Sequence, residues 1–372
     1  MLFILFTVSH VFANVKINIR RSKVLISLTT ISVSVCNIIM AGEEKVCIVA
    51  SVSPCMLDVV SEEQEAVKDD YNIIQWSEFI QNPDPYFEKV QGLLLSPVQN
   101  VQLTDDLLRK MSNLKVVCSV GVGVDHLDLP LLRKYGIKVG NTPDVVTQPT
   151  ADFAFTLMLA IGRRIPEMME AARGYEVGQK FEIERGFRCR GQDIFESTLG
   201  IIGLGKIGLE VARRAQGFRM KILYHNRKQR LNEIEESVHA TYVPTLAALL
   251  PQVDFLIMCA PLNPSTRHMI TLAQLKLMKS SSFLINIARG GIIKTDDLVE
   301  ALQSRIIAGA ALDATDPGVL PNHHPLLHMP NVIVCPHSGV FTGGGLEAIY
   351  RLALRNLRAA VEGRQMPAEF IE

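Results

Sequence analysis

Short apolar runs alternate with longer amphipathic stretches along the chain from about residue 45 onward. Runs of four to eight apolar residues bounded by turns are typical of parallel strands buried on both faces, and the helically spaced segments between them are typical of the helices that cover those faces. The predicted strands are 46–50, 92–96, 116–120 and 136–139 in the first part, and 199–202, 221–225, 254–259, 282–287, 306–312 and 332–335 in the second. The alternation therefore predicts an α/β fold with parallel sheets.

Two predicted helices stand out from the others. The helix at about 150–164 is almost entirely apolar, so we expect it to be buried, either at a domain or dimer interface or within a core. Thr147 is its expected cap, and Pro149 is expected in its first turn. The helical pattern at 346–361 is expected to pack back onto the first part of the chain, and the charged stretch 165–198 is predicted to be an irregular surface connection.

These elements predict two Rossmann-like domains, each a doubly wound parallel sheet, with a cleft between them. The dinucleotide-binding domain is expected to be continuous and to cover 147–337. The substrate-binding domain is expected to be discontinuous, because it combines 43–146 with the C-terminal part 338–372. An acidic helix at 61–70 is predicted within it.

The leader, residues 1–42, contains no Asp or Glu but several basic residues, and it has three interpretations. The apolar stretch 2–13 resembles a secretory signal, although no basic residue precedes it. The lack of acids also fits a mitochondrial transit peptide, but the β-branched residues that follow argue against an amphipathic helix. We favour the third interpretation, in which translation starts at Met40, the leader is not part of the fold, and the protein is cytosolic.

Composition excludes several classes of function. Lysine plus arginine equals aspartate plus glutamate at 38 each, so no net field favours nucleic acid or an anionic membrane. The seven cysteines are dispersed, without a C-x-x-C pair or a His/Cys cluster at metal-ligand spacing. We therefore expect reduced thiols, with neither a disulfide framework nor a metal site.

A glycine-rich turn follows the predicted strand 199–202 and contains Gly203, Gly205 and Gly208. In a strand, Gly-x-Gly-x-x-Gly turn and helix, the first glycine permits the tight turn, the second lets a pyrophosphate approach the backbone, and the third lets helix and strand pack closely. The phosphates then bind the exposed N–H groups of the helix N-terminus. This stretch predicts dinucleotide binding.

Further motifs surround this turn in the order expected of one enzyme family. They are Ser119-Val120-Gly121-Val122-Gly123-Val124-Asp125-His126, Asn141-Thr142-Pro143, Asn286-Ile287-Ala288-Arg289-Gly290-Gly291, Ala311-Leu312-Asp313 and Pro336-His337-Ser338-Gly339. With the glycine turn, they resemble the D-isomer-specific 2-hydroxyacid dehydrogenases, and most of all the glyoxylate/hydroxypyruvate and 2-ketogluconate reductases. The resemblance covers about residues 46–367.

The resemblance implies reduction of a small 2-oxo acid to a D-2-hydroxy acid by hydride transfer from a nicotinamide, with glyoxylate, hydroxypyruvate and 2-ketogluconate as candidate substrates. Arg289 follows a predicted buried strand, and its planar fork can grip a carboxylate and a ketone oxygen together. His337 matches the family's acid/base histidine, since an imidazole can deliver a proton and take it back near neutral pH. The alternatives are a surface arginine that caps a strand and a structural histidine.

The substrate carboxylate is expected to face the backbone N–H groups of Val122 and Gly123, which otherwise form only a strand-end turn. Asp313 is expected near the nicotinamide, although a structural role is nearly as plausible. The full set of expected cofactor-binding residues is Gly203, Gly205, Lys206, Ile207, Gly208, Asn226, Arg227, Arg230, Pro261, Ile287, Asp313 and Gly339.

The end of the second strand of the dinucleotide domain indicates which nicotinamide binds. NAD-selective folds place Asp or Glu there, where it accepts a hydrogen bond from the ribose 2′-hydroxyl. This chain instead continues Asn226-Arg227-Lys228-Gln229-Arg230, without an acid. Arg227 and Arg230 are able to pair with a 2′-phosphate, so we expect NADPH over NADH. The alternative is a solvated basic loop.

The chain departs from the family pattern at one position. The family pairs its histidine with a glutamate five residues after the aspartate that corresponds to Asp313, and this position is Gly318 here. Without that carboxylate we expect His337 to hold its proton less well at neutral pH and to be less well oriented. Asp316 is the alternative source of a carboxylate.

Gly318 also keeps a second class of function open, a nicotinamide-binding regulatory or scaffold protein with weakened catalysis. The presence of Arg289 and His337 favours the enzyme. The expected partners are a small 2-oxo acid and a second copy of the chain, because dehydrogenases of this kind are usually symmetric dimers. No nucleic acid or membrane partner is expected for the folded domains.

Overall fold

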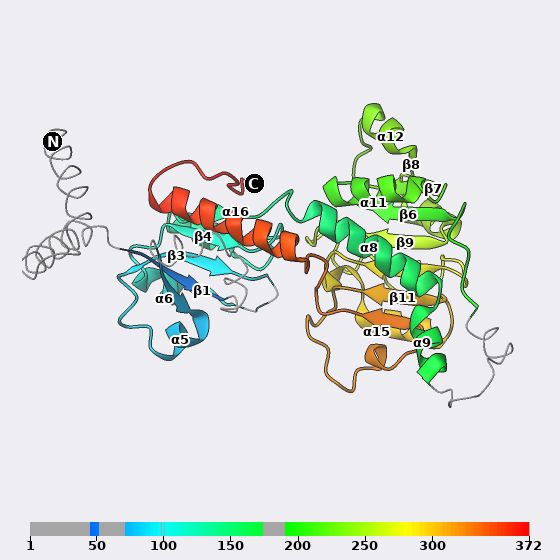
Figure 1. Cartoon of the computed structure of the whole chain (residues 1–372), viewed down its shortest axis with the longest axis horizontal. Coiled ribbons are helices and arrows are strands. Elements are labelled where there is room, and N and C mark those ends of the chain that lie inside the picture. The colour runs from blue at the N-terminus through cyan, green and yellow to red at the C-terminus, as the bar shows by residue number, and fades with distance from the viewer. Residues whose placement is uncertain (1–44, 52–70, 98, 100, 174–189, 372) are drawn as a thin grey trace, which may run out of the picture.

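The structure is a computed structural model that describes residues 45–51, 71–97, 99, 101–173 and 190–371. The leader 1–42 and the predicted acidic helix 61–70 lie outside the described residues. Figure 1 shows two sheets side by side, with the C-terminal helix lying along the first of them. All strand pairs in both sheets are parallel, as the apolar runs predicted.

The first sheet has five strands in the order β2-β1-β3-β4-β5. They are β1 (Val46–Ala50), β2 (Tyr71–Gln75), β3 (Val90–Leu95), β4 (Val116–Ser119) and β5 (Lys138–Gly140). The helices between them are α5 (Trp76–Gln81), α6 (Asp105–Lys110) and α7 (Leu129–Lys134). The long helix α16 (Gly343–Val361) packs against β3, β4 and β5, so the predicted return of the C-terminal segment to the first part is confirmed.

The second sheet has seven strands in the order β12-β11-β10-β9-β6-β7-β8. They are β6 (Thr198–Ile202), β7 (Lys221–His225), β8 (Ala240–Tyr242), β9 (Phe255–Met258), β10 (Phe283–Asn286), β11 (Gly309–Leu312) and β12 (Val332–Val334). Its helices include α11 (Lys206–Gln216), α12 (Asn232–Val238), α13 (Leu246–Leu249), α14 (Leu272–Leu275) and α15 (Thr295–Gln303), with short 3-10 turns at Leu250–Gln252, Gly290–Ile292 and Pro325–Leu327. The strand order reverses at β6, as in a doubly wound sheet.

The apolar helix α8 (Thr147–Gly162) belongs to the core of the seven-stranded sheet. It packs against α11 and the strands β10 and β11, with Phe155, Met158 and Ile161 buried there. Core packing therefore explains its apolar character. The predicted cap on Thr147 is wrong: Val146 precedes the first helical residue in helical backbone geometry, and no side chain caps the helix.

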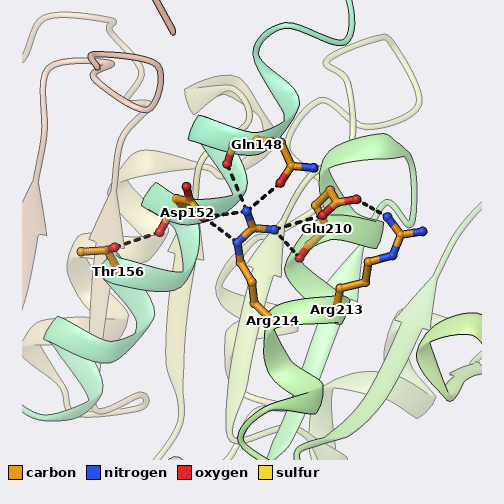
Figure 2. A network of polar contacts seen from close by, with 6 residues as sticks. All are labelled: Gln148, Asp152, Thr156, Glu210, Arg213 and Arg214. Atoms are coloured by element: carbon orange, nitrogen blue, oxygen red, sulfur yellow. Dashed lines mark hydrogen bonds and ion pairs between the residues drawn. The ribbon is translucent and has the colours of Figure 1, made fainter. Parts of the chain in front are cut away.

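A polar network fixes α8 to α11, as Figure 2 shows. The Arg214 side chain on α11 donates to Asp152 Oδ1 at 2.7 Å and to Gln148 Oε1 at 2.8 Å, both on α8. It also pairs with Glu210 on its own helix. The network therefore joins the first turns of α8 to the C-terminal half of α11. Val146 and Thr150, at the start of α8, and Ile207, at the start of α11, line the cavity described below.

The predicted surface connection 165–198 is regular in its first part. It forms the helix α9 (Ile165–Arg173), which has no buried residue, so its surface position is confirmed and its irregular form is corrected. Three apolar side chains on it are exposed, Ile165, Met168 and Met169. Residues 174–189 lie outside the described residues, and the domain boundaries proposed from sequence stay a prediction.

Candidate active site

A cavity of about 250 Å³ lies where the carboxyl ends of both sheets face each other. Parallel strands present their following loops at one edge, which is where α/β sheets bind ligands. The cavity receives residues from the loops after β3, β4, β10, β11 and β12 and from the N-terminal parts of α8, α11 and α16. The sequence-predicted residues that line it are Val122, Gly123, Ile207, Ile287, Arg289, Asp313, His337 and Gly339.

Arg289 reaches the cavity from the turn after β10, and Asn286 at the end of that strand shapes the turn. Asn286 is fully buried, and its side-chain amide donates to the Arg289 carbonyl at 3.0 Å and to the Ala314 carbonyl at 3.2 Å. Its Oδ1 accepts from the Ala288 N–H at 3.1 Å. One buried amide therefore fixes the backbone that carries Arg289. The motif included Asn286, but sequence reasoning assigned it no role.

The Arg289 guanidinium makes a contact that sequence reasoning missed. Its Nε lies 3.1 Å from both carboxylate oxygens of Asp125, in the turn after β4. Its Nη1 donates to the Ala288 carbonyl at 3.0 Å. A methyl group placed on Gly123 would lie 1.8 Å from Nη2, so the guanidinium occupies the space that a side chain at Gly123 would fill. Arg289 therefore joins the two sheets at the cavity.

His337 follows β12 and Pro336 in left-handed backbone geometry, with a φ of 57°. Its neighbour Ser338 donates its backbone N–H to Asp313 Oδ1 at 2.7 Å, and Gly339 donates to Asp313 Oδ2 at 2.9 Å. Asp313 is 3% exposed, at the end of β11. Its carboxylate thus ties down the loop that holds the imidazole, which gives Asp313 a structural task beside any cofactor contact.

The electrostatic surroundings of His337 disfavour its protonated form. Burial lowers the pKa of His337, and the Arg289 cation lowers it further, while the carboxylates of Asp313 and Asp125 act in the opposite direction. Burial also raises the pKa of Asp313. The hydrogen bonds from Ser338 and Gly339 and the charge of His337 lower the pKa of Asp313, but burial has the larger effect. The expected weak proton affinity of His337 agrees with these directions.

Gly318 lies in an exposed loop, and a methyl group placed on it would meet no atom within 4 Å. The loop is held by Thr315, whose hydroxyl donates to the Gly318 carbonyl at 3.2 Å. Asp316, the alternative carboxylate, is not among the described charged groups that act on the His337 pKa. The carboxylates that do act on it come from Asp125 and Asp313.

The glycine turn has the geometry that a pyrophosphate requires. Gly203 has a φ of 101°, and a methyl group there would lie 2.7 Å from the Ala260 nitrogen. A methyl group on Gly208 would lie 2.3 Å from the Gly203 carbonyl oxygen, so helix and strand touch at this point. Gly205 caps α11 without a side-chain hydrogen bond and faces open space. The N–H groups of the first turn are therefore available to an anion, and the turn fits a dinucleotide.

The remaining predicted cofactor residues do not line the cavity but follow the neighbouring strands β9, β6 and β7 at the same edge of the sheet. Asn226 Oδ1 accepts from the Leu204 N–H at 2.8 Å and so joins the end of β7 to the glycine turn. Arg227 and Arg230 are exposed. The full set outside the cavity lining is Gly203, Gly205, Lys206, Gly208, Asn226, Arg227, Arg230 and Pro261. The Lys206 ammonium forms an ion pair with the exposed carboxylate of Asp144.

Neither a metal cluster nor a membrane span is found in the part of the chain that the structure describes. No three His, Cys, Asp or Glu side chains among these residues come together as metal ligands. No helix among them combines the length and apolar character needed to cross a bilayer.

Comparison with known proteins identifies the family. A family model of the D-isomer specific 2-hydroxyacid dehydrogenase, NAD binding domain, matches residues 155–339. A glyoxylate reductase of Thermococcus gammatolerans is 37% identical over 305 residues, which are 82% of this chain and 90% of that relative. The chain belongs to the D-isomer-specific 2-hydroxyacid dehydrogenases. The resemblance inferred from the motifs is confirmed.

Two further relatives support this D-2-hydroxyacid dehydrogenase assignment. A human glyoxylate reductase/hydroxypyruvate reductase is 40% identical over 259 residues, covering 69% of this chain and 77% of the relative. The crystal structure of an NADPH-dependent glyoxylate/hydroxypyruvate reductase from Sinorhizobium meliloti, in complex with NADP and malonate, has a TM-score of 0.71 and 28% identity, covering 88% of this chain and 97% of that one. This D-2-hydroxyacid dehydrogenase is therefore an NAD(P)-dependent oxidoreductase with the two-domain fold that the sequence predicted.

Proposed function

We propose that this dehydrogenase reduces small 2-oxo acids to D-2-hydroxy acids with NADPH, and that glyoxylate and hydroxypyruvate are its substrates, with 2-ketogluconate as a further candidate. The observation that carries the proposal is the meeting of Arg289 and His337 in one cavity, beside the backbone of Gly123. A cation and an imidazole that face the same space are the two groups that carbonyl reduction needs from the protein.

The two side chains have separate tasks in this proposal. Nη2 of Arg289 donates no hydrogen bond to the described residues, so it is free to hold the substrate carboxylate and polarise the ketone oxygen. His337 donates its proton to that oxygen as the carbonyl becomes a hydroxyl. NADPH, when bound, supplies the hydride for the carbonyl carbon. Ile207 and Ile287 line the same cavity and exclude water from the reacting carbon.

The preference for NADPH rests on the segment after β7. Arg227 and Arg230 are exposed there beside Asn226, which is bonded to the glycine turn, and the segment contains no carboxylate that would repel a 2′-phosphate. The Sinorhizobium meliloti enzyme named above, itself NADPH-dependent, is consistent with this preference.

We also propose that the enzyme is a cytosolic homodimer. The apolar side chains of Ile165, Met168 and Met169 on α9 are exposed in the single chain. Three exposed apolar side chains on one short helix are the kind of surface that a partner chain covers in a dimer. Analytical ultracentrifugation checks the assembly: Met169→Lys is expected to shift a dimer toward monomer, and a monomeric wild type would contradict the proposal.

A second candidate function follows from Gly318, which leaves His337 without the family's glutamate. In that case the chain binds NADPH but turns over slowly or not at all, and acts as a nicotinamide-responsive regulator or scaffold.

Steady-state kinetics decide between the two candidates. NADPH oxidation is followed with glyoxylate, hydroxypyruvate and 2-ketogluconate from about pH 5 to 8. The enzyme proposal predicts turnover that Arg289→Ala and His337→Gln each reduce by roughly 100-fold or more, with a lower kcat/KM for NADH than for NADPH. NADPH binding without turnover at any pH would instead support the regulator, and equal or better use of NADH would contradict the cofactor proposal.

A further inference from the structure

The contact between Asp125 and Arg289 joins residues 164 positions apart in the chain. Asp125 belongs to the loop after β4 in the five-stranded sheet, and Arg289 to the turn after β10 in the seven-stranded sheet. The side chains are 31% and 23% exposed, respectively, so water screens the pair only in part. The pair is therefore a partly buried bridge, and its Arg289 side chain lines the cavity.

The geometry of this bridge leaves the end of the guanidinium open. Both Asp125 oxygens approach Nε, rather than the Nη1–Nη2 edge that a substrate carboxylate would use. Nη1 is bonded to the Ala288 carbonyl, and Nη2 lies over Gly123. Asp125 thus fixes Arg289 through Nε and leaves Nη2 available to a substrate carboxylate.

The loop that carries Asp125 is itself anchored. The buried Ser119 hydroxyl donates to the Gly123 carbonyl at 2.8 Å, and the buried Asn141 amide donates to the Val122 carbonyl at 2.9 Å. A methyl group on Gly123 would lie 2.6 Å from Asp125 Oδ1, as well as against Arg289. Glycine is needed here because the carboxylate and the guanidinium pack directly on the backbone.

Asp125 also contributes to the charge balance around His337. The groups that act on this imidazole are the Arg289 cation and the carboxylates of Asp313 and Asp125. Asp313 is already bound to two backbone N–H groups, and Gly318 supplies no carboxylate. The neighbouring His126 adds no charge near neutral pH, because burial lowers its pKa to about 4.

We propose that Asp125 is a positioning residue of this site, which orients Arg289 through Nε and places a carboxylate charge beside the Arg289–His337 pair, where the chain has lost the family's glutamate. The proposal rests on the reductase function proposed above. It predicts that Asp125 serves both the binding of the 2-oxo acid and the protonation of His337, although it touches neither the substrate nor the cofactor.

Kinetics of Asp125→Asn test the positioning of Arg289. This variant keeps the shape of the side chain and removes its charge, and Asp106→Asn is the matched control because Asp106 is exposed on α6, away from the cavity. The KM for hydroxypyruvate is expected to rise about tenfold in Asp125→Asn, with the KM for NADPH unchanged and no effect in the control. The alkaline limb of kcat/KM is expected to move to lower pH. Unchanged KM and pH profile would overturn the proposal.

Histidine titration by NMR tests, separately from turnover, whether the Asp125 carboxylate raises the pKa of His337. The His337 signal is assigned by its absence in His337→Gln, and its pKa in Asp125→Asn is expected to fall by about one unit. If Asp125→Asn folds poorly, a second comparison replaces it. The double variant Asp125→Asn/Arg289→Gln, which removes both charges, is compared with the single variant Arg289→Gln. The pKa of His337 should be lower in the double variant. An unchanged pKa overturns the proposal. Absence of turnover in the wild type refutes the reductase function alone, because the titration still reports on Asp125.

Discussion

The carboxylate of Asp313 accepts a hydrogen bond of 2.7 Å from the backbone N–H of Ser338. Asp313 directly follows β11, and Ser338 follows β12, so the bond joins the loops after two neighbouring strands, directly beside His337. Gly339 donates to the same carboxylate, which leaves this loop little freedom. The position of His337 therefore depends on Asp313 rather than on the exposed loop that contains Gly318.

Asp313→Ala is expected to damage both stability and catalysis. It leaves the N–H groups of Ser338 and Gly339 without their acceptor, which costs about 1–3 kcal/mol in the free energy of unfolding. We expect kcat to fall as the imidazole loses its fixed position, as measured by denaturant unfolding and NADPH oxidation. Asp316→Ala is the control from the adjacent loop. An equal loss of kcat in that variant would mean that Asp316 supports His337 instead.

The pH dependence of the wild type follows from the surroundings of His337. In the direction of reduction His337 has to carry the proton, and burial and Arg289 hold the pKa of His337 below its usual range. The protonated fraction therefore falls as pH rises through that lowered pKa, so kcat/KM for the 2-oxo acid should decline before neutral pH is reached. A profile that is flat or rising through neutrality would contradict the assignment of His337 as the acid.

Gly318→Glu is expected to increase activity. Nothing lies within 4 Å of a methyl group at this position, so a side chain begins there without a clash. The family pattern pairs a glutamate at this position with the histidine, and a carboxylate beside His337 would raise the pKa of His337. We expect kcat/KM near neutral pH to rise about tenfold and the alkaline limb to move to higher pH. Gly318→Gln is the matched control without the charge. An equal gain from glutamine would assign the effect to the loop, and no gain from glutamate would show that the missing carboxylate does not limit the rate.

The two glycines Gly203 and Gly205 are expected to respond differently to alanine. At Gly203 the φ of 101° and the approach of the Ala260 nitrogen to 2.7 Å leave no room for a methyl group, so Gly203→Ala should lose about 2 kcal/mol or more in the free energy of unfolding. Gly205→Ala meets no atom and should fold normally, yet bind NADPH more weakly where the pyrophosphate approaches. Calorimetry of unfolding and of NADPH binding separates the two effects. Normal NADPH affinity in Gly205→Ala would place the pyrophosphate elsewhere.

Replacing Arg227 with Glu is expected to change cofactor preference. The exposed Arg227 guanidinium would pair with the 2′-phosphate of NADPH. A glutamate carboxylate at this position would repel the 2′-phosphate and accept a hydrogen bond from the 2′-hydroxyl of NADH instead. We expect kcat/KM for NADPH to fall roughly tenfold or more, with little change for NADH. Lys228→Glu makes the same charge change one residue along. A similar loss in both variants would indicate only a general effect of charge in a basic loop.

The local pattern of apolar residues was sufficient to predict most strands, because a strand that is buried on both faces forms a nearly continuous apolar run. The strands Phe255–Met258 and Phe283–Asn286 are examples. The pattern failed for β2 and β8, which are partly exposed edge strands without such a run. The cap on Thr147 failed for a related reason. Side-chain caps need an extended residue before the helix, and here Val146 already has helical geometry.

The amino-acid sequence by itself determined the parallel α/β fold and the convergence of Arg289, Asp313 and His337, because each follows an apolar strand and parallel strands end at one edge of a sheet. Only the tertiary structure decided that Asp125 bonds to Arg289 and that Asp313 holds the loop of His337. The first contact depends on how closely two separate sheets approach, and the second on the direction of one carboxylate among buried backbone groups. Neither quantity is encoded in the local periodicity of the chain.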